Sequence, residues 1–330
     1  MSDRPMALFA LSSEHFDALF PAEVRQRIGA VAEIDTELVV ERFDDPRLAG
    51  RLAELEVLIT GWGCPPLTED FLAAAPKLRA VLHAAGSVKA HVTQAAWDRG
   101  IVVSSAAAAN AIPVAEYALA TIILAGKGVF TLRESFRVDR TFKLGHIHPG
   151  IGNHGRRVGI IGASRIGRQV LELLRPFDFK VQVHDPYAEG LDIPLVSLPE
   201  LLSTSDIVSV HAPSTPQTYR MIDREGLALL RDGAVLINTA RGDLVDTEAL
   251  VGELRTGRIS AVLDVTDPEP LPSASILYDL PNAFLTPHVA GSHGNELARL
   301  GECAAEELER LVAGLSLRYQ VTTTDLDRVA

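Results

Sequence analysis

Residues 157–185 constrain the fold of this chain more than any other stretch. They read RVGIIGASRIGRQVLELLRPFDFKVQVHD: a short apolar run, a glycine-bearing turn, an amphipathic pattern and a second apolar run ending in Asp185. Short continuous apolar runs predict buried strands, and apolar residues spaced three and four apart predict a helix. The stretch therefore predicts a strand–turn–helix–strand unit of a parallel, doubly wound sheet.

This unit has the order of parts that a dinucleotide site requires. Gly162 permits a sharp turn, Gly167 permits close packing of the helix, and the helix N-terminus offers N–H groups and positive dipole charge to a pyrophosphate. Asp185 can accept hydrogen bonds from a ribose diol and would repel a 2′-phosphate. No Arg or Lys follows it in PYAE at 186–189, so the pattern favours NAD over NADP.

Ser164 departs from the G-x-G-x-x-G pattern, which reads G-x-S-x-x-G here. Serine adds a Cβ and a hydroxyl where glycine lets the backbone approach the phosphates, so it either crowds a phosphate or bonds to it. A strand–helix unit that binds no nucleotide is the alternative interpretation.

Composition excludes several classes of partner. The chain has 330 residues, room for two domains, and a net charge of −12, which argues against nucleic acid and anionic membranes. Its two cysteines, Cys64 and Cys303, are too few for a disulfide framework. The first apolar run is short for a signal peptide, and no run reaches the roughly 20 residues of a transmembrane helix. We expect a cytoplasmic protein.

From Met6 to about Val103, short apolar runs alternate with helical patterns, which predicts another parallel sheet. The expected strands are 6–11, 37–43, 57–60, 78–83 and 101–104, and the expected helices are 21–30, 46–53, 68–74 and 92–99. In the loop after 78–83, the N–H groups of Ala85, Gly86 and Ser87 suit an anion such as a carboxylate. An ordinary turn explains this loop equally well.

The middle of the chain predicts one buried helix and one polar loop. Residues 110–127 are apolar on most of the helix circumference and should link domains, pack against a second subunit, or do both. Residues 131–156 predict a solvated loop. His146 and His148 have a metal-like H-x-H spacing, but no Cys or carboxylate accompanies them, so we predict no metal.

The second half alternates strands and helices again. Expected strands are 207–211, 234–238, 261–265 and 283–286, and expected helices are 224–230, 247–256 and 296–312. Asp246 is a suitable N-cap and Gly257 a suitable C-terminal residue for the 247–256 helix.

Three polar residues follow these strands, at the edge where a doubly wound sheet carries its site. Arg241 can hold a carboxylate with two hydrogen bonds, and His288 can exchange a proton near neutral pH. Glu269 would orient the imidazole and favour its protonated form. Beside a nicotinamide these groups suffice to interconvert an alcohol and a ketone on a 2-hydroxy acid. Structural ion pairs are the alternative interpretation.

Several motifs resemble the D-isomer-specific 2-hydroxyacid dehydrogenases over nearly the whole chain. They are VGIIGASRIG at 158–167, HDPY at 184–187, VSVHAPSTPQT at 208–218, INTARGDLVDTEAL at 237–250, LDVTDPEPLP at 263–272, LTPHVAG at 285–291 and, in the first half, VAEYAL at 114–119. Three departures are Ser164, His293 where Thr or Ser is usual, and ISAVLDV, which is one residue shorter than the common form.

The resemblance implies a Rossmann NAD-binding domain, residues 107–294, inserted in a flavodoxin-like substrate domain, residues 1–106 plus 295–330. It implies Arg241 as the binder of the substrate carboxylate, with Ala85, Gly86 and Ser87, and His288 as general acid/base paired with Glu269. The implied cofactor-binding residues are Gly162, Ser164, Arg165, Ile166, Gly167, Asp185, Ala212, Thr218, Thr239, Ala240 and Asp264. A homodimer through the 110–127 helix is also implied.

The leading hypothesis is an NAD-dependent oxidoreductase that interconverts a 2-keto acid and a D-2-hydroxy acid. The alternative is a non-catalytic NAD-sensing corepressor or scaffold on the same fold, because such a protein can retain all three polar residues. An enzyme resembling formate dehydrogenase ranks lower, since Gln would be expected in place of Glu269. The sequence leaves the particular 2-hydroxy acid open.

Overall fold

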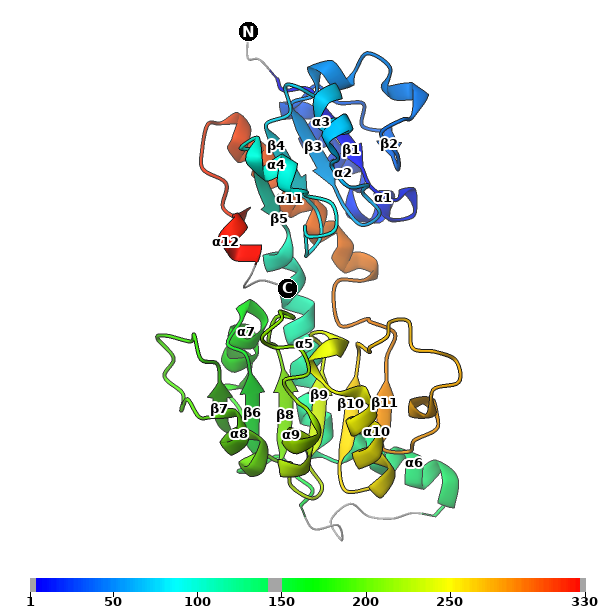
Figure 1. Ribbon diagram of the computed structural model, residues 1–330, viewed down its shortest axis with the longest axis vertical. Helices are drawn as coiled ribbons and strands as arrows, with labels where there is room; N and C mark the ends of the chain where they lie inside the picture. Colours follow the sequence, from blue (N-terminus) through cyan, green and yellow to red (C-terminus); the bar gives the residue numbers. More distant parts are fainter. Residues whose placement is uncertain (1–3, 142–149, 327–330) are drawn as a thin grey trace. The chain divides into compact units, whose positions relative to one another are not determined.

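The computed structural model describes residues 4–141 and 150–326, and the chain forms two compact units (Figure 1). The first unit takes in the chain up to Asn110 and again from Ser292, and the second spans Ala111–Gly291. From the sequence, these crossings were expected at 106/107 and 294/295. Each unit holds one six-stranded sheet.

The first sheet has the strand order β12-β5-β4-β3-β1-β2. Its strands are β1 (Ala7–Ala10), β2 (Val39–Val40), β3 (Val57–Thr60), β4 (Ala80–His83), β5 (Val102–Ser105) and β12 (Gln320–Val321). The first five run parallel, as predicted, whereas β12 pairs antiparallel with β5. The sheet is therefore parallel except at this edge.

Helices cover both faces of this sheet because its apolar side chains alternate. Phe9 packs in one core with α1 (Ser13–Leu19), α2 (Ala22–Val31) and α11 (Leu297–Val312). Leu8 packs in the opposite core with residues of α3 (Glu69–Ala74) and α4 (Gln94–Asp98). A strand buried on both faces is the arrangement that parallel sheets require. The short helix α12 (Thr323–Leu326) follows β12.

The second sheet is parallel throughout, in the order β11-β10-β9-β8-β6-β7. Its strands are β6 (Arg157–Ile161), β7 (Lys180–His184), β8 (Ile207–Val210), β9 (Val235–Asn238), β10 (Ser260–Leu263) and β11 (Ala283–Leu285). The strand order reverses between β6 and β8, which is where a doubly wound sheet opens a crevice for a ligand.

Helices also cover both faces of the second sheet (Figure 1). On one face lie α5 (Ala107–Gly126) and α7 (Arg165–Leu174), and on the other lie α8 (Leu198–Thr204), α9 (Arg224–Leu229) and α10 (Thr247–Thr256). Two six-stranded, mostly parallel sheets with helices on both faces confirm the predicted α/β fold class.

Three expectations about local structure were wrong. The predicted loop at 131–156 begins as helix α6 (Val129–Asp139), because Gly128 turns the chain at φ +64° and Phe130 then packs on Phe284, 4.6 Å between ring centroids. The predicted helix at 46–53 is two 3₁₀ turns separated by Gly50 at φ +75°. The predicted strand at 37–43 shrinks to β2, a two-residue edge strand.

Within the described ranges, α5 is the one helix long and apolar enough to cross a membrane by length and composition alone. Its residues Ala115, Ala118 and Ile122 are buried in the same core as Val158 and Ile160 of β6. That is the environment of a helix in the core of a domain.

Candidate functional site

In the glycine turn after β6, two glycines lie so close to neighbouring backbone that a side chain would not fit. Gly162 has φ +92°, and a Cβ there would lie 2.6 Å from the backbone nitrogen of Ala212. A Cβ at Gly167 would lie 2.0 Å from the carbonyl oxygen of Gly162. Both positions therefore need glycine, and together they leave a backbone cradle of the kind that receives phosphates.

Ser164 is the N-cap of helix α7, which is ten residues long. Its Oγ accepts a hydrogen bond from the N–H of Gly167 at 3.3 Å. The N–H groups of Arg165 and Ile166 meet no acceptor among the described residues. The helix N-terminus therefore still offers donors and positive dipole charge to an anion.

Asp185 directly follows β7 and bonds to the glycine turn. Its Oδ2 accepts a hydrogen bond from the N–H of Ala163 at 2.7 Å, and its Oδ1 accepts one from the N–H of Tyr187 at 2.8 Å. Each carboxylate oxygen can accept a second hydrogen bond, so the group also suits a ribose diol.

The other predicted cofactor residues follow β8 and β9, which pair in parallel. The hydroxyl of Thr218 donates to the carbonyl of Pro213 at 2.6 Å and so shapes its own loop. The Thr239 hydroxyl is buried and has no partner among the described residues. A buried hydroxyl of this kind calls for a polar partner, so the segment fits a dinucleotide beside the Gly162 cradle.

Asp264 holds the turn that carries His288. Its carboxylate, in a residue only 2% exposed, accepts hydrogen bonds from the Thr286 hydroxyl at 2.6 Å and from the N–H groups of Val289 and Ala290, each at 2.8 Å. Its carbonyl accepts one from the His288 N–H at 2.9 Å. Three donors on one buried carboxylate fix the 286–290 backbone.

His288 and Glu269 are brought together. The Nδ1 of His288 lies 2.5 Å from Oε1 of Glu269, and both side chains are about half exposed, at 50% and 43%. His288 has a positive φ of 55°, which is uncommon for a residue other than glycine and common near active sites. The pair can orient an imidazole toward a ligand and exchange a proton with it.

Arg241 follows β9, next in the sheet to β10, which leads to Glu269. Its Nη1 donates to the carbonyl of Ala240 at 2.6 Å. The next residue, Gly242, is pressed on the following loop, since a Cβ there would lie 2.0 Å from the carbonyl carbon of Thr266. Neighbouring strands thus carry Arg241, Glu269 and His288 at one edge of the sheet.

The predicted anion-binding turn lies in the first unit, after β4. The N–H groups of Ala85, Gly86 and Ser87 donate to no acceptor among the described residues, although Ala85 is fully buried. Successive unpaired N–H groups in a turn suit an anion.

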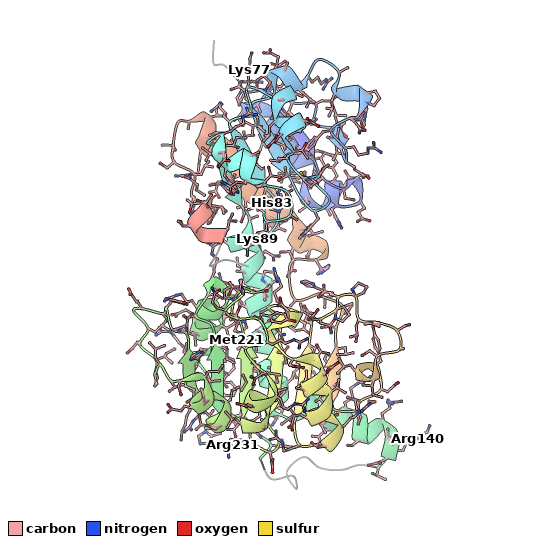
Figure 2. The ribbon with its side chains drawn as sticks, in the orientation of Figure 1. Lys77, His83, Lys89, Arg140, Met221 and Arg231 are labelled. Atoms are coloured by element: carbon pink, nitrogen blue, oxygen red, sulfur yellow. The ribbon has the colours of Figure 1, made fainter. Side chains whose placement is uncertain are left out.

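A buried histidine pair beneath this turn was not predicted from the sequence. His83 ends β4 (Figure 2); one ring nitrogen lies 2.9 Å from the Thr60 hydroxyl, and its ring centroid lies 4.3 Å from that of His91. Burial lowers the pKa of His91 to about 4, and burial and then the neighbouring His91 lower the pKa of His83 well below its usual value. The signal was two histidines flanking a glycine loop.

A tyrosine in α5 was missed as well. The Tyr117 hydroxyl lies 2.8 Å from that of Thr286, which in turn bonds to Asp264. Burial raises the pKa of Tyr117. A phenol within a largely apolar helix was the available signal.

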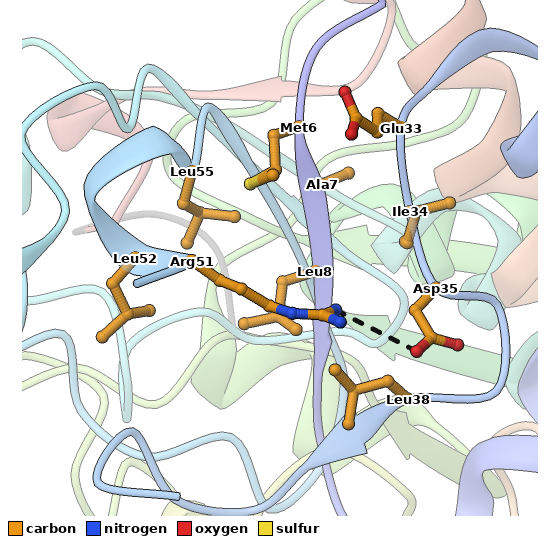
Figure 3. A pocket seen from close by; sticks show the side chains of 10 residues that line it. All are labelled: Met6, Ala7, Leu8, Glu33, Ile34, Asp35, Leu38, Arg51, Leu52 and Leu55. Atoms are coloured by element: carbon orange, nitrogen blue, oxygen red, sulfur yellow. Dashed lines mark ion pairs between the residues drawn. The ribbon is translucent and has the colours of Figure 1, made fainter. Parts of the chain in front are cut away.

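Two further features concern metal binding and a cavity. In the described ranges no three His, Cys, Asp or Glu residues form a metal-binding group, and His146 and His148 lie outside those ranges. A cavity of about 440 Å³ lies beside the start of β1, where Arg51 reaches to within 4.0 Å of Asp35 (Figure 3). It lies at the opposite end of β1 from the edge where the 84–87 turn follows β4.

Known proteins place the chain in a family. The NAD binding domain of the D-isomer specific 2-hydroxyacid dehydrogenases matches residues 119–290. D-3-phosphoglycerate dehydrogenase of Mycobacterium bovis is 34% identical over 86% of this chain and 55% of its own length. The chain thus spans about half the length of that relative.

Two further proteins match over more of their own length. Glyoxylate reductase of Korarchaeum cryptofilum is 34% identical over 74% of this chain and 76% of its own. The crystal structure of the TT0316 protein from Thermus thermophilus is 31% identical, with a TM-score of 0.77, over 96% of this chain and all of that one. The chain therefore belongs to the D-isomer specific 2-hydroxyacid dehydrogenase family.

Proposed function

We propose that this protein is an NAD-dependent oxidoreductase that interconverts a 2-keto acid and a D-2-hydroxy acid. The observation that carries the proposal is the 2.5 Å contact between His288 and Glu269, on the sheet that also carries the Gly162 cradle and Asp185. A proton-exchanging pair and a dinucleotide site on one sheet are the parts that an alcohol–ketone interconversion needs.

His288 has the role of general acid/base in this proposal. Glu269 holds Nδ1, so Nε2 is the atom that gives a proton to the keto oxygen during reduction and takes it back during oxidation. Arg241 grips the substrate carboxylate with two hydrogen bonds and thereby sets the orientation of the carbonyl. When bound, NAD⁺ would accept the hydride during oxidation of the hydroxy acid, and NADH would supply it during reduction of the keto acid.

The Gly162–Gly167 turn, Asp185 and Thr239 would hold the cofactor, with Ala212, Thr218, Ala240 and Asp264 lining its site. The charge of Asp185 favours NAD over NADP, because it opposes a 2′-phosphate. The 85–87 turn is proposed as a second anchor for the substrate carboxylate. A cytoplasmic location and a homodimer built on α5 stay predictions.

The test is loss of NADH absorbance when the purified protein meets a panel of 2-keto acids. His288→Ala should lower turnover by about 10²–10⁴, the usual loss for a positioned acid. Arg241→Lys should chiefly raise KM, because a lysine ammonium cannot form the bidentate hydrogen bonds that a guanidinium makes to a carboxylate. His154→Ala and Arg255→Lys, at exposed positions, are the matched controls.

If the protein binds NADH but oxidises none of it with any keto acid of the panel, this result would favour the non-catalytic sensor over the enzyme. A His288→Ala variant with full turnover would instead mean that another group carries the proton.

A further inference from the structure

The loop after β3 forms the surface beside the proposed carboxylate turn. Thr60 pairs with His83 across β3 and β4, and with Ala10 across β3 and β1, so the loops that follow these strands start side by side. The side chain of a substrate whose carboxylate is held at 85–87 would therefore contact the loop at 61–64 if it extends toward β3.

Trp62 is the prominent side chain of that loop, and it is 37% exposed. Its ring lies edge-on to His15, 5.5 Å between centroids, and its carbonyl accepts a 2.8 Å hydrogen bond from the Ser12 N–H. Gly63 is pressed against Ser12 too, since a Cβ at Gly63 would lie 2.8 Å from the Ser12 Cβ. Trp62 is thus an exposed aromatic side chain on a firmly held loop.

The charges around Trp62 oppose a phosphoryl group. Glu14 lies 3.2 Å from the His15 ring, and Glu41 accepts two hydrogen bonds from Ser13, which lower the pKa of the Glu41 carboxyl. Arg42, the basic residue that follows Glu41, is engaged by Asp44. Lys89 is exposed just beyond the 85–87 turn (Figure 2). The carboxylates of Glu14 and Glu41, which contact the 13–15 segment beside Trp62, oppose a phosphoryl dianion at Trp62.

We propose that Trp62, backed by His15, is a specificity-determining residue that selects 2-keto acids with a bulky apolar side chain, aromatic ones above all, against phosphorylated ones. This inference rests on the proposed function for the reaction itself. An indole face gives an aromatic group both buried area and a favourable ring contact, and it gives a phosphate neither.

The kinetic test compares phenylpyruvate, 3-phosphohydroxypyruvate and glyoxylate as substrates with NADH. We expect kcat/KM for phenylpyruvate to exceed that for 3-phosphohydroxypyruvate by about tenfold or more. Trp62→Ala should lower kcat/KM about tenfold for phenylpyruvate and leave glyoxylate, which has no side chain, within about threefold. Trp62→Phe should restore most of the loss. Preference for the phosphorylated acid, or equal losses on phenylpyruvate and glyoxylate, would overturn the inference.

A binding measurement keeps this test separate from that of the reaction. If none of the three keto acids is reduced, the proposed function fails, and D-phenyllactate is then titrated against the NAD-loaded protein by calorimetry. Phenyllactate that binds about tenfold tighter to the parent than to Trp62→Ala supports the inference without turnover. Equal binding by the two proteins, or no binding, overturns it. Trp97→Phe is the control, because Trp97, the other tryptophan, lies within α4 and packs partly buried against the core.

Discussion

Asp185 accepts a 2.7 Å hydrogen bond from the backbone N–H of Ala163, so the acid that follows β7 is tied to the glycine turn that follows β6. The carboxylate therefore has two functions in the proposed cofactor site. It fixes the shape of the turn, and it places negative charge where a ribose would lie.

The first prediction concerns this charge. The parent should bind NADH more tightly than NADPH by about tenfold or more, which is about 1.4 kcal/mol. Asp185→Asn should narrow that preference, because the amide keeps an acceptor but no longer repels a 2′-phosphate. Fluorescence titration of both cofactors measures the ratio, with Asp192→Asn at an exposed position as control. If the parent binds NADH and NADPH with equal affinity, Asp185 does not contact the ribose of the cofactor.

The second prediction concerns Ser164. Because Ser164 caps α7 through Gly167, Ser164→Ala should cost about 1 kcal/mol of unfolding free energy, whereas Ser164→Gly should cost only a few tenths. The affinity of the Gly variant for NAD should differ from that of the parent by less than about tenfold. A thousandfold gain, measured by calorimetry, would mean that the natural protein is no working NAD enzyme and would favour the corepressor interpretation.

The sequence predicted elements best where the end signals are local. The 247–256 helix was predicted with its true bounds, since the Asp246 side chain accepts the Ala249 N–H at 3.0 Å and Gly257 adopts φ +74°. Helix α6 was missed although it has five apolar side chains, because three of them, Val129, Phe136 and Val138, are exposed. Its packing depends on Phe284, more than 140 residues away, so no local pattern reveals it.

The same division holds for the candidate site. The sequence placed Arg241, Glu269 and His288 after successive strands, because parallel strands end at one edge. It could not show that the Asp264 carboxylate holds the turn around His288 with three donors. Nor could it show the His83–His91 contact, which depends on how the loop after β4 folds back.

The third prediction concerns Glu269. Glu269→Gln should lower kcat/KM for keto-acid reduction, because the carboxylate that holds the His288 ring at Nδ1 is replaced by an uncharged amide. Steady-state kinetics of both proteins test this, with Glu248→Gln, on the exposed part of α10, as control. An unchanged kcat/KM would mean that Glu269 does not act on the proton donor.

The fourth prediction concerns acid stability and His211. This residue is 3% exposed, one ring nitrogen lies 2.9 Å from the Ser209 hydroxyl, and burial lowers its pKa to about 4. Between about pH 6.5 and 4 the unfolded chain therefore binds a proton at His211 that the folded chain does not. Stability falls as pH falls through this window, and the residue adds no such penalty above it.

His211→Leu removes that proton and should reduce the loss of unfolding free energy between pH 7 and pH 5 by about 2 kcal/mol, whatever the variant costs at pH 7. Urea unfolding at the two pH values measures the difference. His154→Leu should leave the loss unchanged, because the His154 side chain is 95% exposed. An identical loss in the parent and His211→Leu would mean that His211 is protonated in the folded protein already at pH 5, through local opening of the loop after β8, and that the backbone around Ala212 is less firmly closed than its contact with Gly162 indicates.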